Sequence, residues 1–235
     1  MLTRTPPATE DALSTPQIST QFDAQYYNEC YGNYFRQNPA RKLRFYRELL
    51  QRHMLPSASP RVLDLGCAFG LFLAGLPPEF NKFGIDASAH AIGGAARLVP
   101  QGHFAVGDCG APPVAAGFDA VVAFDVLEHI PTVNQTLGCV RRSLTRDGVF
   151  LFVVPVYDGP LGGVVRALDR DPTHVHKHSR RWWLDLVGRD FEVISWTGIL
   201  RYLIAGRYYL HAPAKAIRAV APAIAVIARP RAIAG

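Results

Sequence analysis

The sequence has few of the features that mark a membrane-spanning, secreted or metal-binding protein. It contains no run of about 18 uncharged apolar residues, so we expect no transmembrane helix. The first 21 residues are rich in Thr, Pro and Ser without an apolar core stretch, so we expect no secretory signal there. The cysteines follow no metal-ligand spacing, and we interpret Cys30, Cys67, Cys109 and Cys139 as free thiols in a reducing cytoplasm.

Acidic residues are missing after Glu192, although the chain has 19 acidic and 25 basic side chains. The net charge of +6 therefore lies in the C-terminal segment, and the near-neutral remainder argues against a nucleic-acid partner. Basic side chains follow helical spacing at Arg207, His211, Lys215 and Arg218. We predict a basic lid or surface helix over residues 197–221, with weak contact with a membrane surface as the alternative role.

Strand-like and helix-like patterns alternate from residue 61 onward. Strands that are apolar on both faces are typical of a parallel sheet covered by helices, and the alternation implies right-handed crossovers. We therefore predict an α/β fold with a doubly wound, mostly parallel, seven-stranded sheet and helices on both faces. The predicted strands are residues 61–65, 82–86, 103–106, 118–124, 148–156, 191–196 and 223–228, and the main helices are residues 88–98, 132–144 and 179–187.

The remaining N-terminal residues predict a lead-in rather than a second domain. Residues 1–21 are interpreted as a disordered tail, and residues 22–235 as a single domain. Aromatic side chains recur at loosely helical spacing before the break at Pro56 and Pro60. We therefore expect residues 22–58 to form an N-terminal helical cap.

The strongest local signal is the turn that follows the first predicted strand, with Gly66 and Gly70 just after Asp64. Glycine permits positive φ and close approach of a ligand, and ligands of open α/β sheets bind beyond the carboxyl ends of the strands. Asp64 would repel a pyrophosphate but attract an ammonium or sulfonium, by roughly 1.5–3 kcal/mol for a charge-assisted hydrogen bond. The turn therefore favours a ligand with a cationic amino-acid group over a dinucleotide.

Acidic residues also end the next two predicted strands. Asp86 lies about 20 residues beyond the loop, where an acid accepts from a ribose diol in such folds; a cap for the helix near Ser88 is the alternative. Asp108 and Cys109 follow the third strand, where they could contact the same ligand; the alternative is that Asp108 is an ordinary turn aspartate. These positions predict a nucleoside site at one sheet edge.

Together these segments resemble class I S-adenosylmethionine-dependent methyltransferases. The loop is similar to the family's acid-x-Gly-x-Gly-x-Gly motif, with Ala68 in place of the middle glycine, and residues 118–130 are similar to its Phe-Asp strand and Leu-Glu-His segment. The resemblance extends from about Tyr26 to Arg229. It implies a Rossmann-like fold, S-adenosylmethionine as cofactor and a small-molecule acceptor methylated on oxygen. The cofactor-binding residues that it implies are Asp64, Gly66, Cys67, Ala68, Gly70, Asp86, Ala87, Asp108, Cys109, Phe124 and Asp125.

Two histidines are the candidate catalytic residues. The family often has a histidine-containing loop facing the acceptor, so His174 is a candidate general base, with ordinary loop hydrogen bonding as the alternative. His129 could also act as a base or pack against the cofactor. Asp125, Glu128 and His129 could hold a metal, as a similar segment does in some quinone-pathway methyltransferases. We expect instead that these residues form the pocket wall and that no metal is bound.

Two other functions remain open for this sequence. One is a nicotinamide-dependent Rossmann oxidoreductase, against which Asp64 and the missing third loop glycine argue. The other is a non-catalytic protein that keeps a nucleoside pocket. We expect a cytoplasmic protein, in which the basic C-terminal segment would provide any peripheral membrane contact.

Overall fold

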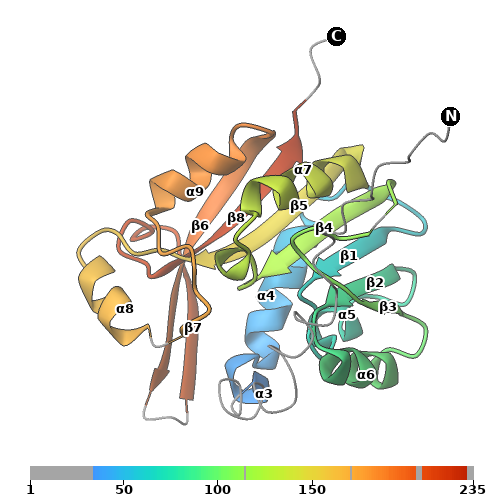
Figure 1. Ribbon diagram of the computed structural model, residues 1–235, viewed down its shortest axis with the longest axis horizontal. Helices are drawn as coiled ribbons and strands as arrows, with labels where there is room; N and C mark the ends of the chain where they lie inside the picture. The colour runs from blue at the N-terminus through green and yellow to red at the C-terminus, as the bar shows by residue number, and fades with distance from the viewer. Residues whose placement is uncertain (1–33, 114, 170, 205–207, 232–235) are drawn as a thin grey trace, which may run out of the picture.

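The structure is a computed structural model that describes residues 34–113, 115–169, 171–204 and 208–231. An eight-stranded sheet crosses the molecule, and helices cover both of its faces (Figure 1). The strands are β1 (Arg61–Leu65), β2 (Asn81–Asp86), β3 (His103–Val106), β4 (Phe118–Phe124), β5 (Leu144–Pro155), β6 (Phe191–Ile204), β7 (Tyr208–Ala214) and β8 (Ala223–Pro230). The helices are α3 (Tyr34–Gln37), α4 (Ala40–Gln51), α5 (Leu71–Ala74), α6 (Ala89–Leu98), α7 (Val133–Ser143), α8 (Gly162–Leu168), α9 (Arg180–Val187) and the 3-10 helix η1 (Leu127–His129).

The strand order is β3-β2-β1-β4-β5-β8-β6-β7. The first five strands of this order are parallel, and β8, β6 and β7 are joined to them by antiparallel pairing. The order reverses at β1, which places the loop after β1 beside the loop after β4 at one edge of the sheet. The predicted doubly wound, Rossmann-like α/β fold is therefore confirmed, with eight strands where seven were expected.

Within the segment predicted as a basic lid or surface helix over residues 197–221, residues 197–204 and 208–214 are strands instead. β6 continues to Ile204, and β7 pairs with it so that Arg201 lies opposite His211. The prediction of a helix relied on the spacing of the basic residues and was wrong. Residues 197–210 are rich in β-branched and aromatic side chains, which favour strands. Pro213 is tolerated because β7 is an edge strand, where a missing N–H breaks no ladder.

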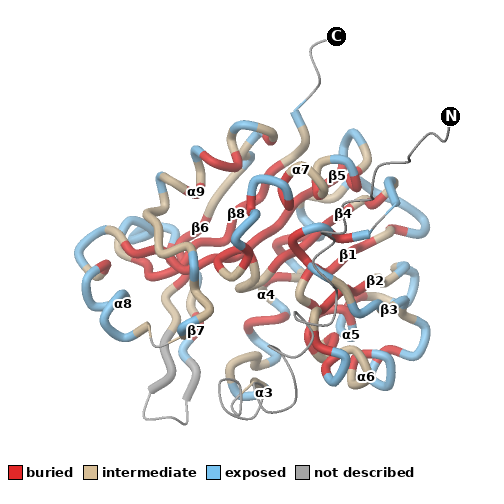
Figure 2. Tube along the Cα trace, viewed as in Figure 1, coloured by how far each residue is buried: buried red, intermediate tan, exposed pale blue. Residues whose placement is uncertain are grey.

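Two apolar layers enclose the sheet, and successive residues of its central strands alternate between them (Figure 2). Phe150 and Phe152 of β5 face α7 and α9, whereas Leu151 and Val153 face α4 and α5. All four side chains are fully buried. Burial of each such side chain stabilises the fold by about 1.5–3 kcal/mol, so both helical layers are fixed to the same rigid strands.

Helices α3 and α4 occupy the described part of the predicted N-terminal cap. The predicted tail at residues 1–21 and the start of the cap lie outside the described residues, as do Cys30 and Arg207. The other three cysteines are free thiols. Within the described ranges, no helix has the length and apolar character needed to cross a membrane.

Candidate functional site

The loop after β1 has an unusual backbone that only small residues accommodate. Gly66, Ala68 and Gly70 all have positive φ, at 71°, 44° and 72°. A Cβ on Gly66 would lie 2.3 Å from a methyl carbon of Val126, which follows β4. Two strand ends therefore approach closely here, and Ala68 adopts the left-handed conformation usual for glycine.

Asp86 ties this loop to the end of β2. Its Oδ2 accepts a hydrogen bond from the Ala68 amide at 2.9 Å, and its Oδ1 accepts one from the Ser88 amide at 2.9 Å. Asp86 is not itself the cap that was its alternative role: the N-cap of α6 is Ser88, whose Oγ accepts from the Ala91 amide, and Asp86 binds the amide of this capping residue. Each carboxylate oxygen keeps a further lone pair for a ligand.

Asp64 and Asp86 form a buried pair of acids. Burial, followed by the charge of Asp86, raises the pKa of Asp64 well above its ordinary value. Burial likewise raises the pKa of Asp86, against the lowering effect of its two backbone hydrogen bonds. Desolvated acids that repel each other are stabilised by a cationic ligand, which would restore the ionised form of both.

One cavity of about 650 Å³ contains this acid pair. Asp86 ends β2 and Asp64 lies in β1, two neighbouring strands of the sheet in Figure 1. The cavity is lined by the predicted cofactor-binding residues Asp64, Gly66, Cys67, Ala68, Asp86, Ala87, Asp108, Cys109, Phe124 and Asp125. Gly70 does not line it; this residue is instead the N-cap of α5, and a Cβ on it would lie 3.1 Å from Ala95. Asp64 and Asp86 therefore face the same compartment, as a shared ligand requires.

Asp125 stands at the centre of a charged cluster that the sequence did not reveal. It has a φ of 57°, pairs with the guanidinium of Arg201, and lies 3.6 Å from the ammonium of Lys42. Burial alone would raise the pKa of Asp125, but Arg201 and Lys42 outweigh burial and lower it to about 2. Local sequence gave no signal for this cluster, since Lys42 comes from α4 and Arg201 from a segment expected to be helical.

His129, a residue of the cavity wall, contacts His174, which lies 45 positions further along the chain and does not itself line the cavity, although its neighbours Thr173 and Val175 do. The centres of the two rings are 4.6 Å apart. His174 Nδ1 lies 2.9 Å from Asp169 Oδ2. The same oxygen accepts from Tyr157 Oη at 2.6 Å and lies 2.8 Å from Lys177 Nζ. Tyr157 and Asp169 were missed by sequence reasoning, because no local pattern links the end of β5 to this loop.

The neighbouring histidines have structural partners. His176 Nε2 lies 2.9 Å from the carbonyl oxygen of Ile130, and His178 stacks on Trp182 with ring centres 3.7 Å apart. Trp183 is fully buried in the core. Of the three alternating histidines, only His174 belongs to the cluster at the cavity.

The fold and this cavity place the chain in the class of doubly wound α/β proteins that bind a ligand at the carboxyl edge of the sheet. The family model described as a methyltransferase domain matches residues 34–198. The chain therefore belongs to this family, that of the class I S-adenosylmethionine-dependent methyltransferases. The nicotinamide-dependent alternative is thereby removed.

Similarity to named proteins supports the same assignment. The chain is 27% identical over 213 residues to the polyketide synthase ThaQ of Burkholderia thailandensis, across 78% of this chain and 10% of the synthase. It is 32% identical over 124 residues to trans-aconitate 2-methyltransferase of Azoarcus, across 51% of this chain and 49% of that protein. The chain thus spans about a tenth and about half of the lengths of these two relatives.

Solved structures share the fold at low sequence identity. A putative methyltransferase of Haloferax volcanii, in complex with an activator, matches with a TM-score of 0.68 and 15% identity, over 93% of this chain and 99% of that one. A S-adenosylmethionine-dependent methyltransferase of Clostridium acetobutylicum matches with a TM-score of 0.63 and 12% identity, over 89% and 98%. These similarities establish the architecture.

The residues present fit the cofactor of this family, S-adenosylmethionine. The absence of a side chain at Gly66 keeps the loop close to the strand end, and the buried acids offer charge to a cationic amino-acid group and acceptors to a ribose. The cavity wall is thus acidic at Asp64 and Asp86, and it also carries His129 and the Lys42–Asp125 ion pair, with Arg201 bound to Asp125 outside the wall.

Proposed function

We propose that this enzyme methylates an oxygen atom of a small-molecule acceptor and that His174 is the general base. The observation that carries the proposal is the pairing of His174 Nδ1 with Asp169 at 2.9 Å, beside a cavity that continues to the acid pair. A family relative named for trans-aconitate acts on a small molecule, which supports an acceptor of that size.

The cofactor residues are assigned by their places around the cavity. Asp64 would pair with the ammonium of S-adenosylmethionine, and Asp86 would accept from the ribose hydroxyls while it holds the loop. Asp108 would accept from the adenine amino group, next to the Cys109 amide. When bound, the cofactor supplies an activated methyl group on a sulfonium, so correct alignment of an acceptor lone pair accounts for much of the rate.

His174 is held in the form that a base requires. Because its Nδ1–H donates to Asp169, the lone pair of Nε2 is left to accept the proton of an acceptor hydroxyl. Tyr157 and Lys177 fix Asp169 in turn. Nε2 would take the hydroxyl proton as the acceptor oxygen receives the methyl group that the bound cofactor would supply, leaving the cofactor as its thioether. His129, in ring contact with His174, is the second candidate for this task.

The test measures binding and turnover separately. Calorimetry should show stoichiometric binding of S-adenosylmethionine, and incubation with a panel of hydroxyl compounds should give products heavier by one CH2 unit. His174→Ala should lower kcat by roughly 100-fold or more while cofactor affinity is kept, in line with loss of a general base. His103→Ala, at an exposed position on β3, is the matched control.

Two results would contradict the proposal. Cofactor binding without turnover on any hydroxyl, amine or carbon-acid compound would indicate a non-catalytic nucleoside-binding protein. Methylation confined to nitrogen or carbon would remove the oxygen acceptor but leave the methyltransferase assignment intact.

A further inference from the structure

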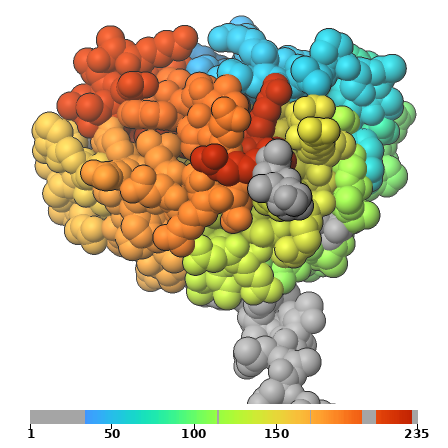
Figure 3. All heavy atoms as spheres, turned by 90° about the horizontal axis from the view of Figure 1, so that it is seen from above, coloured from blue at the N-terminus to red at the C-terminus, as the bar shows by residue number. Residues whose placement is uncertain are grey.

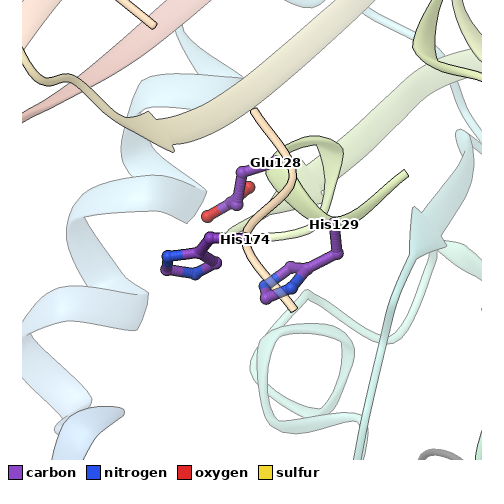
Figure 4. Close-up of side chains that lie close together, drawn as sticks. All are labelled: Glu128, His129 and His174. Atoms are coloured by element: carbon purple, nitrogen blue, oxygen red, sulfur yellow. The ribbon is translucent and has the colours of Figure 1, made fainter. Parts of the chain in front are cut away.

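Three side chains from two distant segments converge beside the cavity. Glu128 and His129 are neighbours in η1, which follows β4, and His174 comes from the loop between α8 and α9 (Figure 4). Each offers one ligand atom, and these atoms all lie within 4.8 Å of one another. The backbone holds the two segments together, because the carbonyl oxygen of Glu128 accepts from the amides of Val175 at 3.0 Å and His176 at 3.1 Å.

In both histidines Nδ1 has a hydrogen-bond partner, whereas Nε2 makes no hydrogen bond within the described part of the chain; His174 Nε2 lies 3.9 Å from Asp171 Oδ2. His174 Nδ1 is bound to Asp169 Oδ2. His129 Nδ1 lies 2.8 Å from Thr173 Oγ1, and that hydroxyl donates to Asp171 Oδ1 at 2.6 Å. Because the Thr173 proton is directed to Asp171, its oxygen accepts from His129, and the lone pair of His129 is on Nε2. Carboxylates that orient histidines in this way, directly or through a hydroxyl, are a common feature of metal sites.

The third side chain has an unsatisfied oxygen. Glu128 Oε2 is fully buried and has no hydrogen-bond partner among the described residues. A buried acceptor without a partner is costly, so its persistence in a folded site needs an explanation such as an ion. Asp125 is not the partner of this oxygen, because the Asp125 carboxylate forms ion pairs with Lys42 and Arg201.

We propose that Glu128, His129 and His174 bind a divalent transition-metal cation. Two imidazole nitrogens and one carboxylate oxygen form a donor set that suits Zn²⁺ and its first-row neighbours and leaves further coordination positions open. This differs from the expectation of no metal, and also from the alternative set of Asp125, Glu128 and His129. His174 is the third member of the set in place of Asp125, because the folded chain brings His174 close to Glu128 and His129.

The cation would also change how the acceptor is ionised, and this consequence rests on the proposed function. A hydroxyl bound to such a cation ionises more readily, and its proton can leave to water. One nitrogen cannot coordinate a metal and accept a proton together. His174 would therefore be a ligand in the metal-bound enzyme and would act as the general base of the proposed function in the metal-free enzyme.

The binding test uses the full-length protein, stripped with EDTA and dialysed against Zn²⁺ or Co²⁺. We expect one equivalent of Zn²⁺ to bind at micromolar concentration or below, and Co²⁺ to give visible absorption bands of low-coordinate geometry. Glu128→Gln and His174→Ala should each weaken Zn²⁺ affinity by about 100-fold, and Asp169→Asn by about 10-fold. His103→Gln, on β3, should change nothing. Circular dichroism of each variant checks that it is folded.

Unchanged Zn²⁺ affinity in folded Glu128→Gln and His174→Ala would overturn the site, as would the absence of binding to the stripped wild-type protein. Activity separates this inference from the proposed function. Equal rates of methyl transfer by stripped protein and by protein loaded with Zn²⁺ would overturn the role of the cation in ionising the acceptor. Zn²⁺ binding at the three residues without methylation of any hydroxyl compound would contradict the proposed function alone.

Discussion

The carboxylate of Asp86 accepts a hydrogen bond from the backbone amide of Ala68 at 2.9 Å and thereby joins the end of β2 to the loop after β1. Ala68 has a φ of 44°, so the bond holds a non-glycine residue in a conformation that is rare for it. The same acid faces the cavity. A residue expected to bind a ribose is therefore also needed to shape the loop that surrounds the cofactor.

Substitution of Asp86 should weaken cofactor binding in two steps. Asp86→Asn keeps an acceptor for one backbone amide but loses the charge, and should weaken S-adenosylmethionine binding by roughly 10-fold. Asp86→Ala also releases the loop and should weaken it by roughly 100-fold or more, since each charge-assisted bond is worth about 1.5–3 kcal/mol. Calorimetry checks both values, with the exposed Asp147→Asn as control. Equal losses in the two Asp86 variants would show that the loop does not depend on this acid.

A methyl group at Gly66 should disrupt the site, whereas removal of one at Ala68 should not. Gly66→Ala adds a left-handed alanine, which costs about 1–2 kcal/mol, and a clash with Val126 at 2.3 Å. We expect a lower Tm and no measurable cofactor binding. Ala68→Gly relieves the strain of a positive φ but raises the conformational entropy of the unfolded chain. These effects oppose each other, so the free energy of unfolding should change by less than about 1 kcal/mol. Thermal unfolding and calorimetry compare them; wild-type affinity in Gly66→Ala would show that the close approach to Val126 is unnecessary.

The affinity for S-adenosylmethionine should fall as the solution becomes mildly acidic. The pKa values of Asp64 and Asp86 are raised by burial, so both take up protons at higher pH than ordinary carboxyl groups. Only the ionised forms attract the ammonium group, so affinity is greatest above these raised pKa values and is lost as pH falls through them. Calorimetry across pH 5 to 8 measures the slope. Asp64→Asn should bind more weakly at every pH and with a flatter profile; an unchanged profile would place the proton uptake elsewhere.

The stability of the fold should decline between pH 6.5 and 4 because of His211. Burial, together with the charges of Lys42 and Arg201, lowers the pKa of His211 to about 4 from 6.5. The folded state thus prefers the neutral ring, which lies 3.1 Å from Tyr46 Oη. Its stabilising contribution is complete above pH 6.5 and is lost as pH falls towards 4, by up to about 3 kcal/mol in the free energy of unfolding.

Urea unfolding at several pH values measures this decline. His211→Gln cannot titrate and should show a shallower fall in the free energy of unfolding than wild type. His103→Gln, on the exposed strand β3, is the matched control and should follow the wild-type curve. A wild-type slope in His211→Gln would assign the acid sensitivity to other groups.

The sequence predicted the site where functional side chains lie within a few residues of a recognisable strand. A buried strand followed by Asp64 and two glycines predicted the loop, and acids at the ends of the next two strands predicted the same edge of the sheet; all three acids line one cavity. Side-chain period alone could not predict the course of residues 197–221. Strand pairing there is decided by contacts with β8 and β7 and not by the spacing of basic residues.

The contacts around His174 and Asp125 were harder to predict, because they join segments that are distant in the sequence. Asp169 becomes important only when the loop after α8 folds back on the end of β5, where Tyr157 contacts it. Arg201 reaches Asp125 across 76 positions of sequence. No local window of sequence contains either pair, so their roles emerge only from the packing of the sheet.

The central position of β8 has a consequence for the order of assembly. Although β8 follows β6 and β7 in the chain, it lies between β5 and β6, and its red end emerges between the yellow and orange segments of Figure 3. In the strand order, β6 and β7 are connected to β5 only through β8, so they can join the sheet only together with β8 or after β8 has paired with β5. The contact between Arg201 of β6 and Asp125 beyond β4 therefore depends on the pairing of a strand that comes later in the chain than either residue.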